Sequence, residues 1–276
     1  MSRIKLIALD MDGTLLDSRK NVTPEVLDAI NTAFDSGVEV VLSTGRCVPE
    51  LTRYFGEIPR LRYAICVSGG YVYDVREQRC IVSHTIPPEL CLKIMETGIR
   101  EDVLIHFLAL DSVTEASKMG HMDRYGMGTY QEMFQKMAVK TDNIFEYLKS
   151  HPERPVNKLN LYHASVEGRE RSRERLSAMG LPIEMVYAER SSLECSPQGV
   201  TKGKGLLELC GHLGIPGECT AAVGDGDNDI AILRTAALPI AMGNANERVK
   251  ALCRITVADC DHDGCAEAIR RAMEYE

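Results

Sequence analysis

The sequence predicts an α/β protein, with a parallel-sheet, Rossmann-like core that is interrupted by an inserted α+β domain. Short apolar segments alternate with helix patterns over the first 75 residues, and the same alternation returns after residue 200. The residues between have strands of mixed polarity and more polar helices. Strands that alternate with helices are typical of parallel sheets, and a change of texture in the middle of the chain indicates an insertion.

The first buried strand is predicted at Ile4–Leu9, a run too short for a helix. A helix should follow from Pro24, with Thr23 as its N-cap, and end before Gly37. The next two buried strands are predicted at Val38–Leu42 and Tyr63–Val67.

The C-terminal part continues this alternation. It is predicted to contain, in order, a helix at Lys202–Leu213, a strand at Thr220–Val223, a helix at Ile230–Arg234, strands at Ala237–Ala241 and Arg254–Val257, and a helix at Gly264–Met273.

The middle of the chain is predicted to be a separate cap domain at residues 85–190, inserted between core segments 1–84 and 191–276. Its expected strands are Val103–Leu110 and Asn157–His163, and residues 169–175 form a helix segment with mixed charges. Mixed signs favour a solvated helix face over an anion site.

Composition excludes several classes of function. The chain has 276 residues, 45% of them hydrophobic and 26% charged, which is typical of a soluble globular protein. Its formal net charge of −8 argues against binding of nucleic acid or of an anionic membrane surface. The sequence does not indicate an oligomeric state.

The N-terminus and the cysteines indicate a cytoplasmic protein. The apolar run that begins at Ile4 ends at Asp10, whereas a signal peptide needs about 7–15 apolar residues. No stretch approaches the roughly 18 apolar residues of a membrane span. The ten cysteines are scattered without a C-x-x-C pair, so we expect reduced thiols and no zinc site.

Three polar clusters directly follow predicted strands. They are Asp10-Met11-Asp12-Gly13-Thr14, Ser43-Thr44-Gly45-Arg46 and Gly224-Asp225-Gly226-Asp227-Asn228-Asp229. Parallel strands bring their carboxyl ends to one edge of a sheet, where ligands bind. Up to five carboxylates would gather there and repel one another without a cation, and their hard oxygens favour Mg²⁺ or Ca²⁺ over zinc.

This arrangement fits phosphoryl transfer. Asp10, just past a strand, can attack phosphorus as a nucleophile, and Asp12 can protonate the leaving oxygen and later deprotonate water. Lys202 and the backbone N–H groups of Met11–Thr14 are candidates for holding the anion. Spacing excludes three alternatives. At these positions the sequence lacks a residue that an EF-hand, a dinucleotide-binding fingerprint or a Walker loop requires.

The clusters resemble the motifs of the haloacid dehalogenase superfamily of phosphotransferases. Asp10–Leu16 matches the first motif, Val41–Arg46 the second, Gly199–Gly203 the third and Gly224–Asp229 the fourth. The insertion between the second and third motifs is similar to the C2 cap of the Cof-type phosphatases. Met242–Ala245 and Asp263–Gly264 match further Cof-type signatures.

The resemblance implies a role for each matching position. Asp10 would be the nucleophile and a Mg²⁺ ligand, Asp12 the acid/base and a ligand through its carbonyl, and Asp225 the acidic ligand. Lys202 would act in catalysis by neutralising the nucleophile and the phosphoryl oxygens. The remaining positions would hold phosphate or support the site: Met11, Thr44, Gly45 and Asn228, with Lys202, at the phosphate, and Asp229 and Ser43 behind them.

The implied function is a Mg²⁺-dependent phosphomonoesterase that acts on a small phosphorylated metabolite, with a sugar phosphate as the first expectation. A phosphomutase of the same fold and a non-catalytic regulatory protein remain open. Ser68-Gly69-Gly70 departs from the family's usual Asn-Gly-Ala. The candidate substrate contacts in the cap are His106, His121, Arg124, Tyr125, Tyr130 and His163.

Overall fold

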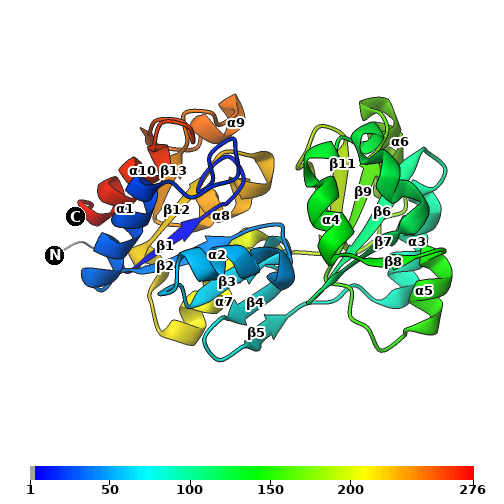
Figure 1. Ribbon diagram of the computed structural model, residues 1–276, viewed down its shortest axis with the longest axis horizontal. Coiled ribbons are helices and arrows are strands. Elements are labelled where there is room, and N and C mark those ends of the chain that lie inside the picture. Colours follow the sequence, from blue (N-terminus) through cyan, green and yellow to red (C-terminus); the bar gives the residue numbers. More distant parts are fainter. Residues whose placement is uncertain (1–3) are drawn as a thin grey trace. The chain divides into compact units, whose positions relative to one another are not determined.

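The computed structural model describes residues 4–276, so the first three residues of the predicted core lie outside the description. The chain divides into two compact units. The first, which we call the core, contains residues up to Gly45, Thr52–Val82 and Thr201–Glu276. The second, the cap, contains Ser83–Val200 together with Arg46–Leu51. Figure 1 labels most of the helices and strands of both units.

The core is built on an eight-stranded sheet with the order β14-β13-β12-β1-β2-β3-β4-β5. Neighbouring strands from β14 to β3 are parallel, and β4 is antiparallel to β3. The strands are β1 (Leu6–Leu9), β2 (Glu39–Ser43), β3 (Tyr63–Cys66), β4 (Tyr71–Asp74), β5 (Arg79–Ser83), β12 (Thr220–Gly224), β13 (Leu238–Ala241) and β14 (Ile255–Thr256).

Every residue of β1 is buried, as expected for a strand of a parallel sheet that helices cover on both faces. Helix α1 packs beside α10, and α7 packs beside α8. The helices are α1 (Pro24–Asp35), α2 (Thr52–Glu57), α7 (Lys202–Leu213), α8 (Ile230–Thr235), α9 (Glu247–Lys250) and α10 (Gly264–Met273). The short 3₁₀ turns are η2 (Val67–Gly69), η5 (Gly217–Cys219) and η6 (Asp227–Asp229).

Local sequence signals explain where the core helices begin. Thr23 caps α1 by accepting a hydrogen bond from the N–H of Val26, and Thr201 caps α7 by accepting one from Lys204. The predicted bounds of α7 and α10 agree with those observed. The sequence did not predict β4 and β5, which add an antiparallel edge to the parallel sheet.

The cap contains a six-stranded sheet with the order β10-β11-β9-β6-β7-β8. Its strands are β6 (Val103–Leu108), β7 (Ser112–Glu115), β8 (Val139–Thr141), β9 (Lys158–His163), β10 (Ile183–Val186) and β11 (Ser192–Pro197). Its helices are α3 (Pro88–Gly98), α4 (Gln131–Met137), α5 (Ile144–Ser150) and α6 (Val166–Ala178), with 3₁₀ segments η1 (Val48–Leu51), η3 (Ala116–Tyr125) and η4 (Gly128–Tyr130).

The two faces of the cap sheet differ. One face packs Ile105, Leu161 and Leu193 against apolar side chains of α3, α5 and α6. The opposite face alternates with it along each strand and carries polar side chains such as Lys158, with a smaller apolar cluster around Tyr162.

The cap extends past the boundary that the sequence predicts at residues 190 and 191. Strand β11 (Ser192–Pro197) pairs with β9 and β10, so it belongs to the cap sheet. Its alternation of Ser192, Glu194 and Ser196 with apolar residues is typical of a strand with one polar face. Among the described residues, no helix has the length and apolar character needed to cross a membrane.

Candidate active site

Strand pairing brings two of the three predicted clusters to the same edge of the core sheet as Asp10. Strand β1 lies between β2 and β12, and Leu9 is in register with both Leu42 and Val223. Asp10 therefore leaves the sheet next to Ser43 of the second motif and Gly224 of the fourth. The backbone N–H of Asp10 donates to the carbonyl of Val223, which fixes its position at the strand end.

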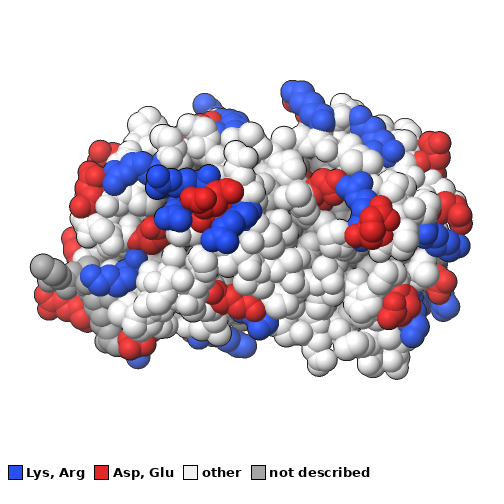
Figure 2. Space-filling model, turned by 90° about the horizontal axis from the view of Figure 1, so that it is seen from below, with Lys and Arg blue, Asp and Glu red and all other residues white. Residues whose placement is uncertain are grey.

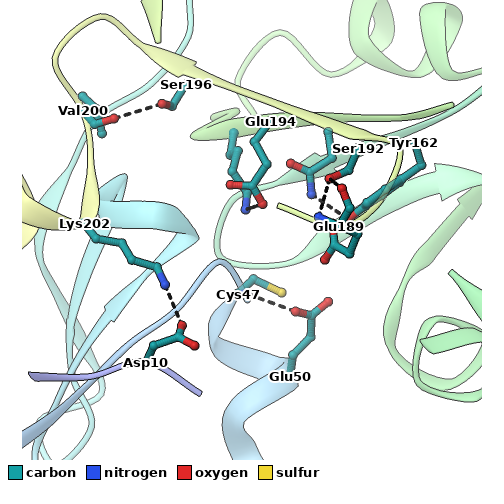
Figure 3. A network of polar contacts seen from close by, with 12 residues as sticks. Asp10, Cys47, Glu50, Tyr162, Glu189, Ser192, Glu194, Ser196, Val200 and Lys202 are labelled. Atoms are coloured by element: carbon teal, nitrogen blue, oxygen red, sulfur yellow. Dashed lines mark hydrogen bonds and ion pairs between the residues drawn. The ribbon is translucent and has the colours of Figure 1, made fainter. Parts of the chain in front are cut away.

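Lys202 joins the nucleophile candidate to the fourth motif. Its Nζ lies 2.6 Å from Asp10 Oδ1 and 2.7 Å from Asp229 Oδ1, and the lysine is almost fully buried. Figure 3 shows the Lys202 side chain extending to the Asp10 carboxylate. Because Lys202 is the first residue of α7, the Thr201 cap sets its position.

Asp229 braces the site rather than facing a ligand. One carboxylate oxygen accepts from Lys202, and the other accepts from the backbone N–H groups of Asp225 and Gly226, each at 3.0 Å. Protein donors therefore engage both oxygens of Asp229. Asp10 and Asp225 are then the carboxylates best placed for direct contact with a cation.

The donor set fits a divalent metal ion. Oxygens of the two candidate ligands, Asp10 and Asp225, and of the bracing Asp229 lie within 4.8 Å of one another. Thr14 Oγ1 donates to Asp225 Oδ1 at 3.0 Å and orients that carboxylate. Gly13 has φ +90°, and a Cβ at this position would lie 2.6 Å from Asp225 Oδ2, so only glycine allows this approach.

The electrostatics also favour a cation. Burial, together with the charges of Asp229 and Asp225, raises the pKa of Asp10 well above its usual value. Burial and Asp229 raise the pKa of Asp225 to about 6. Burial opposes the charge of Lys202, but Asp10 and Asp229 raise its pKa overall, so it stays an ammonium. One buried ammonium cannot offset three clustered carboxylates, whereas Mg²⁺ with its hard oxygen ligands can.

The second motif supplies a buried hydroxyl pair. Thr44 is 2% exposed, its N–H donates to the carbonyl of Ile65, and its carbonyl accepts from the N–H of Ser68. Ser43 Oγ is buried and has no hydrogen-bond partner among the described residues. A buried hydroxyl without a partner is uncommon. Ser43 is therefore a stronger candidate for direct phosphate binding than the sequence analysis, which placed it behind the phosphate-binding residues, had indicated.

The structure gives less support to the other predicted phosphate contacts, Met11, Asn228 and Gly45. Met11 has a buried side chain, so an anion could meet only its backbone. Asn228 lies half-buried in η6 beside Asp229, and Gly45 is also half-buried. Their roles at a phosphate stay predictions.

Sequence reasoning missed Lys20. Its Nζ lies 2.7 Å from Asp12 Oδ1, across a turn that separates the two residues by eight positions. No motif spacing signals this contact, because the conformation of the intervening loop creates it.

Several cap candidates have structural partners instead. His163 Nε2 lies 2.8 Å from Ser172 Oγ, and both Arg124 and Tyr125 hydrogen-bond Asp102. His121 is exposed. The guanidinium carbon of Arg46 lies over the Tyr130 ring, 5.9 Å from the ring centroid.

His106 stands apart from those candidates. It is 2% exposed, and neither ring nitrogen has a hydrogen-bond partner among the described residues. Burial, and to a lesser degree the charge of Lys158, lower the pKa of His106 to about 3, so the ring is neutral. A neutral imidazole offers one donor and one acceptor.

The polar face around His106 contains residues that sequence reasoning did not select. Lys158 Nζ lies 2.7 Å from Glu194 Oε1, and both residues are buried. Asn160 Oδ1 and Glu189 Oε2 are buried without hydrogen-bond partners among the described residues. The alternation of Lys158, Asn160 and Tyr162 with leucines was the available signal.

Comparisons with known proteins agree on one family. A family model described as haloacid dehalogenase-like hydrolase matches residues 7–269. The chain is 26% identical to pyridoxal phosphate phosphatase YbhA of Escherichia coli, over 96% of this chain and 97% of that protein.

Solved structures agree as well. A haloacid dehalogenase-like hydrolase from B. subtilis superimposes with a TM-score of 0.86 at 25% identity, over 97% of this chain and 99% of that one. The sugar phosphatase BT4131, of HAD subclass IIB, superimposes with a TM-score of 0.81 at 25% identity, covering 97% and 98% of the two chains.

Proposed function

The chain belongs to the haloacid dehalogenase-like hydrolases, and we propose that it is a Mg²⁺-dependent phosphomonoesterase of the Cof type that acts on a small phosphorylated metabolite. The observation that carries this proposal is the Asp10–Lys202–Asp229 network. It holds a carboxylate at the end of a buried strand, with an ammonium 2.6 Å away that can neutralise an incoming phosphoryl oxygen.

In the first step, an Asp10 carboxylate oxygen forms a bond to phosphorus while the bond from phosphorus to the leaving oxygen breaks. Asp12 donates a proton to that leaving oxygen, and an alcohol departs. Lys202 balances charge on the phosphoryl oxygens, and the Ser43 and Thr44 hydroxyls donate to them.

In the second step, water attacks the phosphorus of aspartyl-phosphate and gives its proton to Asp12. The bond between phosphorus and Asp10 breaks and releases inorganic phosphate. Bound Mg²⁺, held by the Asp10 and Asp225 carboxylates and the Asp12 carbonyl, would supply charge neutralisation and alignment of the phosphoryl group.

The polar face of the cap sheet supports a hydroxyl-bearing substrate such as a sugar phosphate. His106, Asn160 and Glu189 bring to this face buried polar atoms that have no hydrogen-bond partner within residues 4–276, and a polyol can both donate to and accept from such groups. His106→Phe should then raise KM for the preferred substrate more than KM for 4-nitrophenyl phosphate. Equal effects on the two substrates would remove His106 from substrate recognition.

The decisive experiment measures phosphate release from sugar phosphates, nucleotides, flavin phosphate and pyridoxal phosphate, with Mg²⁺ and with a chelator. We expect release that needs the metal and that Asp10→Asn abolishes. Activity that persists with chelator or in Asp10→Asn would contradict the mechanism. Isomer interconversion without net phosphate release would identify a phosphomutase, and binding without either reaction would identify a regulatory protein.

A further inference from the structure

A salt bridge outside the Asp10–Lys202–Asp229 network reaches the acid/base candidate. Lys20 Nζ lies 2.7 Å from Asp12 Oδ1, and the two side chains are 38% and 27% exposed. Lys20 lies in the loop between β1 and α1, which belongs to the core throughout.

The loop holds Lys20 in a conformation that lysine seldom adopts. Its φ is +65°, in the left-handed region, where the Cβ of a residue other than glycine is crowded by the backbone. Asp17 closes the turn, because its carbonyl accepts from the N–H of Lys20 and its side chain accepts from the N–H of Asn21. Helix α2 supports the same turn, since Tyr54 Oη donates to the Lys20 carbonyl and Arg53 donates to Asn21 Oδ1.

This support distinguishes Lys20 from an ordinary surface lysine. Exposed salt bridges contribute little to stability, so this one does not explain why a strained residue is braced from two directions. Backbone strain is concentrated at functional sites, where the surrounding structure maintains it. The neighbouring Arg19 is exposed and carries the same charge on the same turn.

We propose that Lys20 is a positioning residue for Asp12. By holding Oδ1, the ammonium fixes the orientation of the carboxyl group, so that Oδ2 faces the oxygen that gains or loses the proton. This inference rests on the proposed phosphatase function, because it gives Asp12 its proton-transfer role. Lys20 itself does not touch the reacting atoms.

The proposal predicts a dependence on the leaving group. Phenyl phosphate releases a more basic oxygen than 4-nitrophenyl phosphate, so its cleavage needs more help from the acid. The ratio kcat/KM reports the steps up to the first irreversible one, which here is transfer of the phosphoryl group to Asp10. A badly oriented Asp12 should therefore lower kcat/KM mainly for phenyl phosphate.

The test compares Lys20→Met with the matched control Arg19→Met, which removes the same charge one residue away. We expect Lys20→Met to lower kcat/KM about tenfold or more for phenyl phosphate, and less than about threefold for 4-nitrophenyl phosphate. Arg19→Met should change neither by more than about twofold. Lys20→Arg should recover most of the loss, and thermal unfolding of each variant shows that the fold is retained.

A double-mutant cycle with Asp12→Asn shows whether Lys20 acts through Asp12. If it does, Lys20→Met should have no further effect on phenyl phosphate hydrolysis in the Asp12→Asn background. Equal losses with both substrates, an undiminished loss in that background, or no loss at all would overturn the proposal. Failure of the wild-type enzyme to hydrolyse any phosphate ester would instead refute the proposed function on which it rests.

Discussion

Val67, Ser68 and Gly69 form a strained turn directly after β3. All three have positive φ values, of 53°, 56° and 93°. A valine in this region is an outlier, because its branched Cβ is crowded. The N–H of Ser68 donates to the carbonyl of Thr44, and a Cβ on Gly69 would lie 2.0 Å from the Thr201 carbonyl. The turn thus links the second motif to the start of α7, which explains why the strain is retained.

This strain leads to a prediction about Ser68, which stands where the family usually has asparagine. Asparagine tolerates the left-handed conformation better than serine does, so Ser68→Asn should raise the free energy of unfolding by roughly 0.5–1 kcal/mol. Ser68→Ala is the control, since alanine gains no such tolerance and should give no increase. Urea unfolding measures both, and a Ser68→Asn protein that is less stable than the wild type would contradict this account.

The carboxylate cluster leads to a prediction about metal binding that does not depend on activity. Mg²⁺ at about 100 times its dissociation constant should stabilise the folded protein by about 2.7 kcal/mol and raise Tm. Asp225→Asn removes a direct ligand candidate and should abolish that increase. Asp227→Asn should preserve it, because Asp227 pairs with Arg248 and lies outside the cluster of three. A wild-type Tm that Mg²⁺ does not change would exclude the metal site.

At the scale of elements, helix α6 shows how a highly charged segment is held in place. Residues 169–175 were predicted as a solvated helix face, and α6 exposes Arg171, Arg173 and Glu174 but buries Ser172. Two of its arginines nevertheless reach the same carboxylate. Arg171 Nε lies 3.0 Å and Arg175 Nη1 2.7 Å from Glu101 Oε1, after the end of α3.

These ion pairs predict a specific dependence of stability on pH. Hydrogen bonds from Arg171 and Arg175 lower the pKa of Glu101 from 4.5 to about 2. A carboxyl group with a lowered folded-state pKa adds stability above its ordinary pKa and loses it as the pH falls toward the folded value. Glu101→Gln should therefore destabilise the protein by about 0.5–1 kcal/mol at pH 7, and the difference should shrink between pH 4.5 and 2.

Urea unfolding at a series of pH values measures this difference, with Glu174→Gln as the control. Glu174 is an exposed residue of the same helix, and its replacement should have little effect at any pH. A destabilisation by Glu101→Gln that stays constant down to pH 3 would show that packing, rather than charge, anchors α6.

The sequence predicted those elements whose pattern is local. Buried strands such as β1 are continuous apolar runs that end in polar residues, and α7 has a threonine cap and a terminal glycine. It did not predict β5, which has no regular alternation, or β11, which alternates but is identified as part of the cap sheet only by its pairing with β9 and β10. The predicted motif residues Asp10, Lys202 and Asp229 do come together because parallel strands share an edge.

Other parts of the site depend on side-chain geometry that sequence patterns do not contain. The hydroxyl of Ser43, which lacks a hydrogen-bond partner in the described part of the chain, and the contact from Lys20 to Asp12 arise from loop conformation. The brace that Asp229 forms with backbone N–H groups also depends on the folded turn. Sequence spacing could indicate which motif residues lie near one another, but it could not show which side chain hydrogen-bonds to which.

At the scale of the whole molecule, the net charge of −8 has two different components. On the face shown in Figure 2, acidic and basic side chains are interspersed, as expected for solubility. The three carboxylates that the core gathers within 4.8 Å of one another are instead mostly buried. The overall charge therefore does not reveal the candidate metal site, because that site depends on where a few buried carboxylates lie and not on the total number of charges.

Because the chain divides into two compact units, we predict that the cap can fold by itself. Residues 83–200 contain all six strands of the cap sheet, and its main apolar cluster includes Ile94, Ile105, Leu159 and Leu161. A chain segment of this length can bury enough apolar surface to be stable. The fragment lacks Arg46–Leu51, which contacts it through Arg46 and Tyr130, but that contact lies outside the main cluster.

We therefore expect fragment 83–200 to be monomeric or weakly associated, with a cooperative urea transition. Leu161→Ala tests the origin of that transition, because Leu161 is fully buried within the cluster and its truncation should cost about 2–5 kcal/mol. Leu110→Ala is the matched control, since Leu110 is 50% exposed. A fragment that unfolds without cooperativity would show that the cap sheet needs the core for its stability, and that the insertion is not an independent folding unit.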